Sequence, residues 1–432
     1  MSHVFHRTAD PIEVARAEGC WVYDTEGNAY LDAAGGAIVT NVGHGAIDVR
    51  ESLMGIDYVH PSVFTSRALE DYAERLSGYV PVDGVKIFPT SGGAESVETA
   101  IKMARSFQAA NGHKERDVII SRNHSYHGNT LGALDVSGRP PLREPYESWL
   151  GRSVQVPQVN EYRCPSPEHP RDCAGWHAAL LEERIIAIGA DRVAAFIGEA
   201  IGGAATAAAV PPSGYWEAVA EVCDRHEVLL IVDEVMTGFG RTGKWFAIEH
   251  TTVRPDILVS GKGAGGGFWP LGLCMASARV YDAIMGAGGF VHGFTFSHSP
   301  SGAAVGAAVL EKLIADDLVS ASERQGEKLM AGTAGAIGDI EVVGDIRGKG
   351  LLVGIEFVAD RDTRVPFPRE VRFSERLAAT ARTNGLLVYP SSGCADGVSG
   401  DSILLGPPFT IDDDEIGMVV DRLNSAIGEV AA

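Results

Sequence analysis

The stretch VLLIVDEVMTGFGRTG, residues 228–243, places two acidic residues directly after five apolar ones. A short apolar run of this kind is typical of a buried β-strand. Helix-like segments such as Glu95–Phe107 and Tyr215–Arg225 separate several similar runs, which are Val118–Ile120, Val193–Ile197 and Asp256–Val259. The alternation predicts an α/β domain with a mostly parallel sheet flanked by helices. Ligands of such sheets bind outside the carboxyl ends of the strands.

The two ends of the chain have a different pattern from this middle part. The N-terminal CWVYDTEGNAYLDA predicts a hairpin, and after about residue 320 strand-like pieces such as GLLVGIEFVA are mixed with helices. We expect a large domain over residues 56–320. Residues 1–55 and 321–432 are expected to form a smaller α+β domain together. The proline-rich, polar segment 157–170 is expected to be a surface loop.

Composition and net charge limit the classes of molecule that the protein is expected to bind. The 432 residues are 45% hydrophobic, which is enough for a sizeable core, and the net charge of -21 would repel nucleic acids and anionic membrane surfaces. No apolar run approaches the roughly 20 residues that a membrane span needs. The stretch MSHVFHRTAD lacks an apolar signal segment. We therefore expect a soluble, cytoplasmic protein with neither nucleic-acid nor membrane partners.

Cysteine usage gives no sign of a cross-linked or metal-stabilised fold. The sequence contains neither a CxxC pair nor metal-site spacing among its six cysteines, which are Cys20, Cys164, Cys173, Cys223, Cys274 and Cys394. Scattered cysteines in a chain of this length are typical of reduced thiols. We expect neither a disulfide framework nor a metal site.

A single lysine, Lys262, stands among glycines in LVSGKGAGGGFWPLG, residues 258–272, just after a predicted strand. The glycines leave room for a planar group at the lysine amine. A lysine with a lowered pKa is a nucleophile toward aldehydes and forms a Schiff base with them. The alternative is an ordinary solvated loop lysine.

Two further motifs also follow predicted strands. In TSGGAESVETAIKMAR, residues 90–105, a Ser-Gly-Gly turn opens a helix. The free N–H groups at such a helix start suit a phosphate, although an ordinary helix start has the same pattern. Tyr126 in NHSYHGN could stack on a flat ligand, or it could be an ordinary core or surface aromatic.

Asp233 needs a partner, because a carboxylate at the end of an apolar strand is costly to bury alone. A cationic ring nitrogen would be a suitable partner. A metal bound by Asp233 and Glu234 is the competing reading, but neighbouring strand residues point to opposite faces and no histidine is placed to complete such a site. Together the motifs supply groups for a phosphate, a ring, a ring nitrogen and an aldehyde carbon, which are the parts of pyridoxal 5'-phosphate (PLP).

In this order the motifs resemble the class III aminotransferases, which are fold-type I PLP-dependent enzymes, and among them the ω-transaminase group. The resemblance runs nearly end to end through YDTEGNAYLDAAGG, GHG, the helix motif, YHG, DEVMTGFGRTG, SGKG, HGFTFSHSP and GPPF. It implies a homodimer with its active sites at the interface. It also implies an enzyme that moves an amino group between an amine or amino acid and an aldehyde, ketone or keto acid, in ping-pong half-reactions.

The resemblance assigns a role to each matching residue around the cofactor ring. Lys262 would hold the cofactor as a Schiff base and, once freed, move the proton between the substrate Cα and the cofactor C4′. Asp233 would pair with the protonated pyridine nitrogen. Val235, two residues on and so on the same strand face, would pack on one side of the ring, and Tyr126 would stack on the other.

Further matches concern the phosphate and the second subunit. Gly93 and Ala94 would donate backbone N–H groups to the phosphate. Thr295 in HGFTFSHSP matches a residue that reaches the phosphate of the partner subunit's cofactor. Glu199 in FIGEAIGG matches a carboxylate that lies near the cofactor and Asp233.

The chain departs from its relatives where they bind a carboxylate. Ornithine-type members use a glutamate and an arginine as a gate, and here these positions are Ala204 and Leu404. The loss of both is physically coherent, because either charge alone would be buried without a partner. The loop of residues 389–402 lacks the arginine of ω-transaminases, and Asn129 rather than arginine follows YHG. We therefore expect one substrate to be an amine, aldehyde or ketone with no carboxylate next to the reacting carbon, while the acceptor can still be a keto acid such as pyruvate.

Other activities are compatible with the same cofactor residues. A racemase, decarboxylase, aminomutase or amino-phosphate lyase would keep Lys262 and Asp233, and a catalytically inactive protein of the same fold is a further alternative. Residues 58–64 and Trp269 are expected to help shape the substrate pocket. The sequence gives no position in the fold for Arg139 or Arg143.

Overall fold

The computed structural model describes residues 12–53, 58–167 and 169–431 of the chain. The N-terminal MSHVFHRTAD and the expected domain boundary between residues 55 and 56 lie outside these ranges. Within them, no helix is both long enough and apolar enough to cross a membrane.

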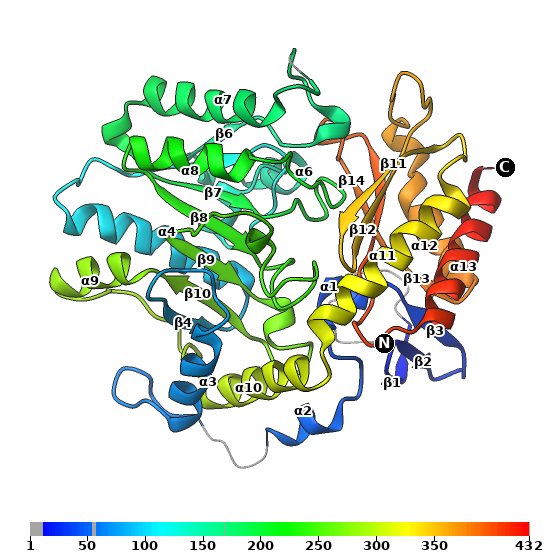
Figure 1. Cartoon of the computed structure of the whole chain (residues 1–432), viewed down its shortest axis with the longest axis horizontal. Helices are drawn as coiled ribbons and strands as arrows, with labels where there is room; N and C mark the ends of the chain where they lie inside the picture. The colour runs from blue at the N-terminus through cyan, green and yellow to red at the C-terminus, as the bar shows by residue number, and fades with distance from the viewer. Residues whose placement is uncertain (1–11, 54–57, 168, 432) are drawn as a thin grey trace.

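A seven-stranded sheet forms the centre of the molecule, with the strand order β4-β10-β9-β8-β7-β5-β6 (Figure 1). Strands β6, β5, β7, β8 and β9 pair in parallel, whereas β10 is antiparallel to both β9 and β4. The predicted mostly parallel sheet is therefore confirmed. The strands are β4 (Lys86–Thr90), β5 (Val118–Arg122), β6 (Ser153–Val156), β7 (Val193–Glu199), β8 (Leu229–Glu234), β9 (Ile257–Ser260) and β10 (Gly272–Ala276).

Helices pack around this sheet. The predicted helix Tyr215–Arg225 is confirmed as α8, and the predicted helix Glu95–Phe107 lies within α4. The described helices up to residue 337 are α1 (Gly35–Ile38), α2 (Ile47–Glu51), α3 (Arg67–Ser77), α4 (Gly93–Ala110), α5 (Leu131–Val136), α6 (Pro140–Arg143), α7 (Cys173–Ile188), α8 (Tyr215–Arg225), α9 (Ala278–Gly286), α10 (Pro300–Ala315) and α11 (Leu318–Ile337).

Both faces of the central strands are covered, because alternate residues of a strand point in opposite directions. Ile197 and Ile231 pack in one buried cluster with apolar residues of α4 and α9. Phe196 and Leu230, each next to one of them in the chain, pack in a second cluster with α7 and α8. Every residue of β7, β8 and β9 is buried, which is why these strands read as continuous apolar runs.

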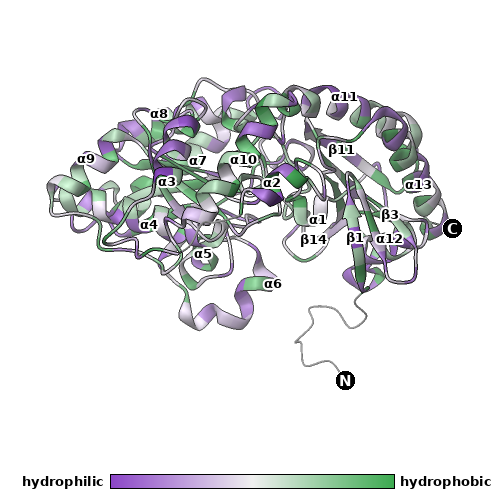
Figure 2. Cartoon of the chain, turned by 90° about the horizontal axis from the view of Figure 1, so that it is seen from below, coloured by the Kyte–Doolittle hydropathy of each residue, from purple (hydrophilic) through white to green (hydrophobic). Residues whose placement is uncertain are grey.

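Two smaller sheets are built from the ends of the chain, and both lie beside the central sheet (Figures 1 and 2). The first has the order β1-β2-β3-β13 and the second the order β11-β12-β15-β14. The predicted hairpin is confirmed, because β2 and β3 pair antiparallel, and β3 also pairs in parallel with β13 from the far end of the chain. The division into two domains at the expected boundaries stays a prediction. The elements are β1 (Val14–Glu18), β2 (Trp21–Asp24), β3 (Ala29–Asp32), β11 (Val343–Lys349), β12 (Leu352–Phe357), α12 (Phe373–Thr383), β13 (Leu386–Leu387), β14 (Tyr389–Ser392), β15 (Asp401–Leu405) and α13 (Asp413–Ala431).

A buried arginine joins the three parts of this structure. Arg241 follows β8 in the turn that contains GFGRTG, and its guanidinium donates to the carbonyl oxygens of Leu351 at 3.0 Å, Pro407 at 2.6 Å and Thr40 at 3.2 Å. Burial lowers the pKa of Arg241 to about 9, so the group stays charged at neutral pH. One side chain thus links the N-terminal segment, the turn after β8 and the C-terminal sheet.

Removal of this guanidinium should destabilise the chain. We expect Arg241→Met to lower the free energy of unfolding by at least about 3 kcal/mol, because three buried carbonyls lose their donor and each costs about 1–3 kcal/mol. Urea or thermal unfolding of the two proteins measures the difference. Arg254→Met, which removes an exposed arginine paired with Asp83, is the control and should lose much less. Equal losses in the two variants would contradict the role of Arg241.

Candidate active site

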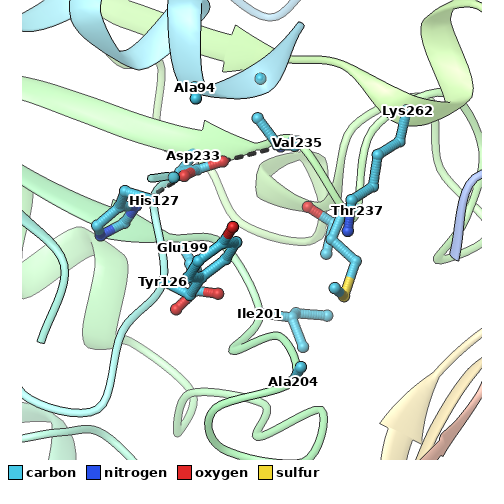
Figure 3. Close-up of a pocket in the computed structure, with 13 residues that line it drawn as sticks. Ala94, Tyr126, His127, Glu199, Ile201, Ala204, Asp233, Val235, Thr237 and Lys262 are labelled. Atoms are coloured by element: carbon cyan, nitrogen blue, oxygen red, sulfur yellow. Dashed lines mark hydrogen bonds and ion pairs between the residues drawn. The ribbon is translucent and has the colours of Figure 1, made fainter. Parts of the chain in front are cut away.

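A cavity of about 210 Å³ opens at the carboxyl ends of β7 and β8, beside the start of α4. This is the edge where the sheet topology predicts a ligand site. Figure 3 shows the side chains that converge on it from strands, turns and the helix start. The lining residues are Gly93, Ala94, Tyr126, His127, Gly128, Glu199, Ile201, Ala204, Asp233, Val235, Met236, Thr237 and Lys262.

Two carboxylates stand side by side at the strand ends. Glu199 is the last residue of β7 and is directly opposite Asp233 of β8 in the parallel register. Both side chains are buried. Burial raises the pKa of Glu199, and Glu199 Oε1 accepts the backbone N–H of Gly203 at 2.9 Å. The predicted proximity of Glu199 and Asp233 follows from adjacent strands that end at the same level.

Asp233 is held by two contacts that fix its orientation. Its Oδ2 lies 2.6 Å from Nδ1 of the buried His127, and its Oδ1 accepts the backbone N–H of Val235 at 2.9 Å (Figure 3). His127 Nε2 is buried and has no hydrogen-bond partner among the described residues. His127 is a residue that the sequence analysis missed, although it lies inside the quoted NHSYHGN. Only the folded chain reveals its contact with an aspartate 106 positions away.

Glu234 points away from the cavity, as the alternation of strand residues predicts. Its carboxylate accepts hydrogen bonds from the Thr237 hydroxyl and from the backbone N–H groups of Ala247 at 3.0 Å and Ile248 at 2.7 Å. Burial raises the pKa of Glu234 to about 7. The two neighbouring acids therefore do not share one site, which removes the basis for a metal bound by both.

Val235 lies in a different place from the predicted one. The sequence analysis puts it on the same strand face as Asp233, but β8 ends at Glu234 and Val235 begins the following turn. Val235 still lines the cavity, because its N–H donates to the Asp233 carboxylate and turns the backbone back toward it. Tyr126 lines the same cavity from the segment after β5.

Lys262 is partly buried, with its amine toward the cavity (Figure 3). Burial lowers the pKa of Lys262 to about 8, while the carboxylates of Asp233 and Glu199 act in the opposite direction. A residue at 261 larger than glycine would place its Cβ 3.3 Å from Gly93 and 3.5 Å from Val235. The glycine before the lysine is therefore needed for the close approach of the chain to α4.

The start of α4 presents backbone N–H groups rather than side chains to the cavity. No side chain caps this helix, so the N–H groups of its first turn are free for a ligand. A Cβ at Gly93 would meet a methyl group of Val235 at 2.7 Å, so a larger residue there would have to displace Val235. Gly93 and Ala94 both line the cavity, in agreement with the predicted position of an anion site.

Thr295 and most of the expected pocket residues lie elsewhere. Thr295 is exposed and lines a second hollow with Tyr58, Phe88 and His292, so the structure does not bring it to the cavity of its own chain. Trp269 packs against the hydrophobic core instead of lining the cavity. The expectation that residues 58–64 and Trp269 help shape the substrate pocket stays a prediction, because the expected pocket lies at a dimer interface.

The two gate positions differ in their surroundings. Ala204 lines the cavity, and its carbonyl accepts the Ser391 hydroxyl at 2.6 Å. Leu404 is fully buried in the core on β15 and is not one of the residues that line the cavity. The rest of the apolar wall is formed by Ile201 and Met236, which the sequence analysis did not identify.

The structure also places the two arginines that the sequence left without a position. Arg139 donates to the Ser392 carbonyl at 3.1 Å and the Ser391 hydroxyl at 3.4 Å, which puts it behind the Ala204 wall. Arg143 donates hydrogen bonds to backbone carbonyls that are close to it in the sequence, including that of Ser137 at 2.8 Å. Neither arginine lines the cavity.

Comparison with known proteins places this chain among aminotransferases. The family described as aminotransferase class-III matches residues 4–427 of the chain. The uncharacterized aminotransferase YodT of Bacillus subtilis is 37% identical over 422 residues, which cover 96% of this chain and 95% of that protein. An (S)-enantioselective omega-transaminase from Thermomicrobium roseum is similar in structure, with a TM-score of 0.94 at 33% identity, and the match covers 100% of this chain and 97% of that one. The omega transaminase from Pseudomonas jessenii, solved in complex with PMP, has a TM-score of 0.92 at 29% identity, with 100% and 96% of the chains covered.

The lowered pKa of Lys262 can be tested by chemical labelling of protein stripped of bound small molecules. The neutral, nucleophilic fraction of the amine rises with pH through about 8. Reductive alkylation with a small aldehyde should therefore reach half its maximal rate at Lys262 near that pH, whereas ordinary lysines with a pKa of about 10.4 stay protonated there. Peptide mass mapping identifies the labelled lysine, and Lys262→Ala is the control. Labelling of Lys262 no faster than that of exposed lysines would contradict the burial argument.

Proposed function

We propose that the cavity at the ends of β7 and β8 binds PLP in this chain, which belongs to the class III aminotransferase family. The chain is a transaminase, because the family match spans nearly all of it. The family implies PLP, and PMP is bound in a similar structure. The assignment of the cofactor to particular residues is our proposal. The observation that carries it is the partly buried amine of Lys262, which shares one cavity with two carboxylates and an uncapped helix start.

The residues present fit the parts of PLP. The free N–H groups at the start of α4 suit its phosphate, since a helix N-terminus favours an anion. The Asp233 carboxylate, oriented by His127, suits a protonated ring nitrogen. Glycines at 93 and 261 leave space that a Cβ would take from the backbone of α4 and from Val235.

When bound, PLP supplies an aldehyde that condenses with amines and a cationic ring that accepts the electron pair released at the substrate Cα. The Lys262 amine, partly neutral because its pKa is about 8, would hold the cofactor through its aldehyde and would then be free to move a proton at the substrate Cα. Asp233 would pair with the ring nitrogen, and Tyr126 and Val235 would contact the ring.

The apolar wall determines the proposed substrate class. Ile201, Ala204 and Met236 line the cavity beside the charged groups, and no arginine is among the described residues that line it. A substrate carboxylate at this wall would lose its water without gaining a bidentate partner. We infer that one substrate is an amine, aldehyde or ketone without a carboxylate next to the reacting carbon. The acceptor can be a keto acid such as pyruvate.

A single half-reaction tests this substrate class. We expect a primary amine without a carboxylate to convert the bound PLP of the holoenzyme with a kcat/KM at least about tenfold above that for glutamate or ornithine, equivalent to about 1.4 kcal/mol. The loss of the visible cofactor absorption, with no acceptor present, measures the rate. Lys262→Ala is the control in which this change should disappear.

The course of the absorption also separates the alternatives. An absorption that returns while the substrate is consumed would identify a racemase, decarboxylase, aminomutase or lyase reaction instead. Glutamate turnover equal to that of the best amine would contradict the proposed substrate class while leaving transamination intact.

We further propose that the chain forms a homodimer in which Thr295 reaches the phosphate of the partner subunit's cofactor. Large exposed apolar side chains line the hollow that contains Thr295 or follow and precede its lining residues in the chain. They are Tyr58, Val63, Phe64, Val291 and Phe296, of which Val291 is 99% exposed. Apolar side chains grouped on a surface in this way are typical of a protein interface. The cytoplasmic location stays a prediction.

Mixed dimers test the contribution of Thr295. We expect Thr295→Val to weaken PLP binding about tenfold or more, because a hydrogen bond to a charged phosphate contributes about 1.5–3 kcal/mol. In a dimer of one Lys262→Ala and one Thr295→Val subunit, the subunit that keeps Lys262 receives Thr295 from its partner. That site should recover wild-type PLP affinity. A mixed dimer as weak as the Thr295→Val homodimer would place Thr295 in the site of its own subunit and contradict the proposal.

A further inference from the structure

A group of cysteine and histidine side chains lies outside the active site, where the loop after β6 enters α7. Cys164 and His169 belong to the loop, and Cys173 and His177 to the first turns of the helix. Cys164 Sγ lies 3.3 Å from Cys173 Sγ, His169 Nδ1 lies 3.0 Å from Cys173 Sγ, and His177 Nε2 lies 3.9 Å from Cys164 Sγ. None of these four residues lines the cavity at β7 and β8.

Helix geometry and a helix cap bring the four donors together. Cys173 and His177 are four residues apart on α7 and so lie on the same face of the helix. Asp172 caps this helix by accepting the backbone N–H of Gly175 at 2.8 Å, which fixes where the helix begins. The loop then returns Cys164 and His169 to the same face. Cys173 and His177 are buried, Cys164 is partly buried and His169 is exposed, so the group is open to solvent on one side only.

We propose that Cys164, His169, Cys173 and His177 bind one Zn²⁺ ion. Two thiolates and two imidazoles are a common ligand set of structural zinc sites, with Zn–S bonds of about 2.3 Å and Zn–N bonds of about 2.0–2.1 Å. A regular tetrahedron with these bonds has S···S edges of about 3.8 Å and S···N edges of about 3.5 Å. The donor atoms of Cys164, His169 and Cys173 all lie within 4.8 Å of one another, and their separations of 3.3 and 3.0 Å need shifts of about half an ångström to reach those values. His177, whose Nε2 lies 3.9 Å from Cys164 Sγ, is outside this close group and has to turn toward it to become the fourth ligand.

The types of donor in this group suit a zinc ion. Two thiolates would balance the charge of Zn²⁺ and leave a neutral site, which suits its buried side. Soft thiolate and imidazole donors favour Zn²⁺ over Mg²⁺ or Ca²⁺.

The position of the group indicates a structural role. The loop before α7 also contacts the C-terminal sheet, because Arg163 pairs with Glu356 of β12 and Arg364 donates to the Tyr162 carbonyl. In Figure 1 this loop runs between α7 and β11. An ion bound at its base would tie the loop to α7 and so help to hold the C-terminal sheet against the central part of the chain.

Metal analysis of the holoenzyme tests the proposal. The full chain, produced without a histidine tag and passed through metal-free buffer, should contain one zinc per chain by elemental mass spectrometry. Cys164→Ser, Cys173→Ser and His177→Asn should each lose most of it. Cys20→Ser is the matched control, since Cys20 is an equally buried thiol that lies against Thr410 rather than in this group. Three results overturn the proposal: no zinc with both thiols free, a Cys164–Cys173 disulfide in the peptide map, or zinc retained by the variants.

A second measurement tests the proposal even if one of the substituted proteins does not fold. Cys164 lies in the loop and is only partly buried, so Cys164→Ser is the least disruptive change. A chelator should lower the thermal midpoint of the wild-type holoenzyme by about 5 °C or more and that of Cys164→Ser hardly at all. Reloading with Co²⁺ should restore the midpoint and produce the visible absorption of a tetrahedral cobalt–thiolate site. Equal chelator effects on the two proteins, or no such absorption in the wild type, would overturn the zinc assignment.

Discussion

The placement of one amine beside two buried carboxylates is the constraint on which the centre of this molecule depends. Lys262, Asp233 and Glu199 face one cavity, and each charge would be costly to bury alone. The parallel sheet makes the arrangement possible, because adjacent strands β7 and β8 end at the same level and place the two acids side by side. His127 and the backbone of Val235 then fix the orientation of Asp233, so that its charge is held before any ligand binds.

A second constraint acts between the central sheet and the ends of the chain. Arg241 lies only eight residues after Asp233, and it binds carbonyl groups of both terminal segments. The same turn that forms one wall of the cavity therefore also positions the C-terminal sheet. This sheet reaches the cavity through Ser391, whose hydroxyl donates to the Ala204 carbonyl. Changes in the terminal segments can thus alter the substrate wall without touching the cofactor residues.

The cavity has both charged and apolar lining. Lys262, Asp233 and Glu199 supply the charged groups, and Ile201, Ala204 and Met236 supply apolar ones. The proposed zinc group stands apart from both. Its loop touches the C-terminal sheet through Arg163 and Arg364, so it acts on the position of that sheet rather than on the chemistry.

The sequence by itself determined the features that depend on neighbours along the chain. The apolar runs at 193–197 and 228–232 identified buried parallel strands, and Asp233 and Lys262 were recognisable because each directly follows such a run. Only the tertiary structure decided which distant groups meet. The contact of His127 with Asp233 joins residues 106 positions apart, and the hydroxyl of Ser391 reaches Ala204 across 187 positions. The cysteine spacing alone did not reveal the group of Cys164, His169, Cys173 and His177, because two of its donors are histidines. The start of α7 at Cys173 sets the spacing of the donors. The physical reason is the same in each case. Strand and helix periods are local properties of the sequence, whereas the partner of a buried polar group depends on how the chain returns to it.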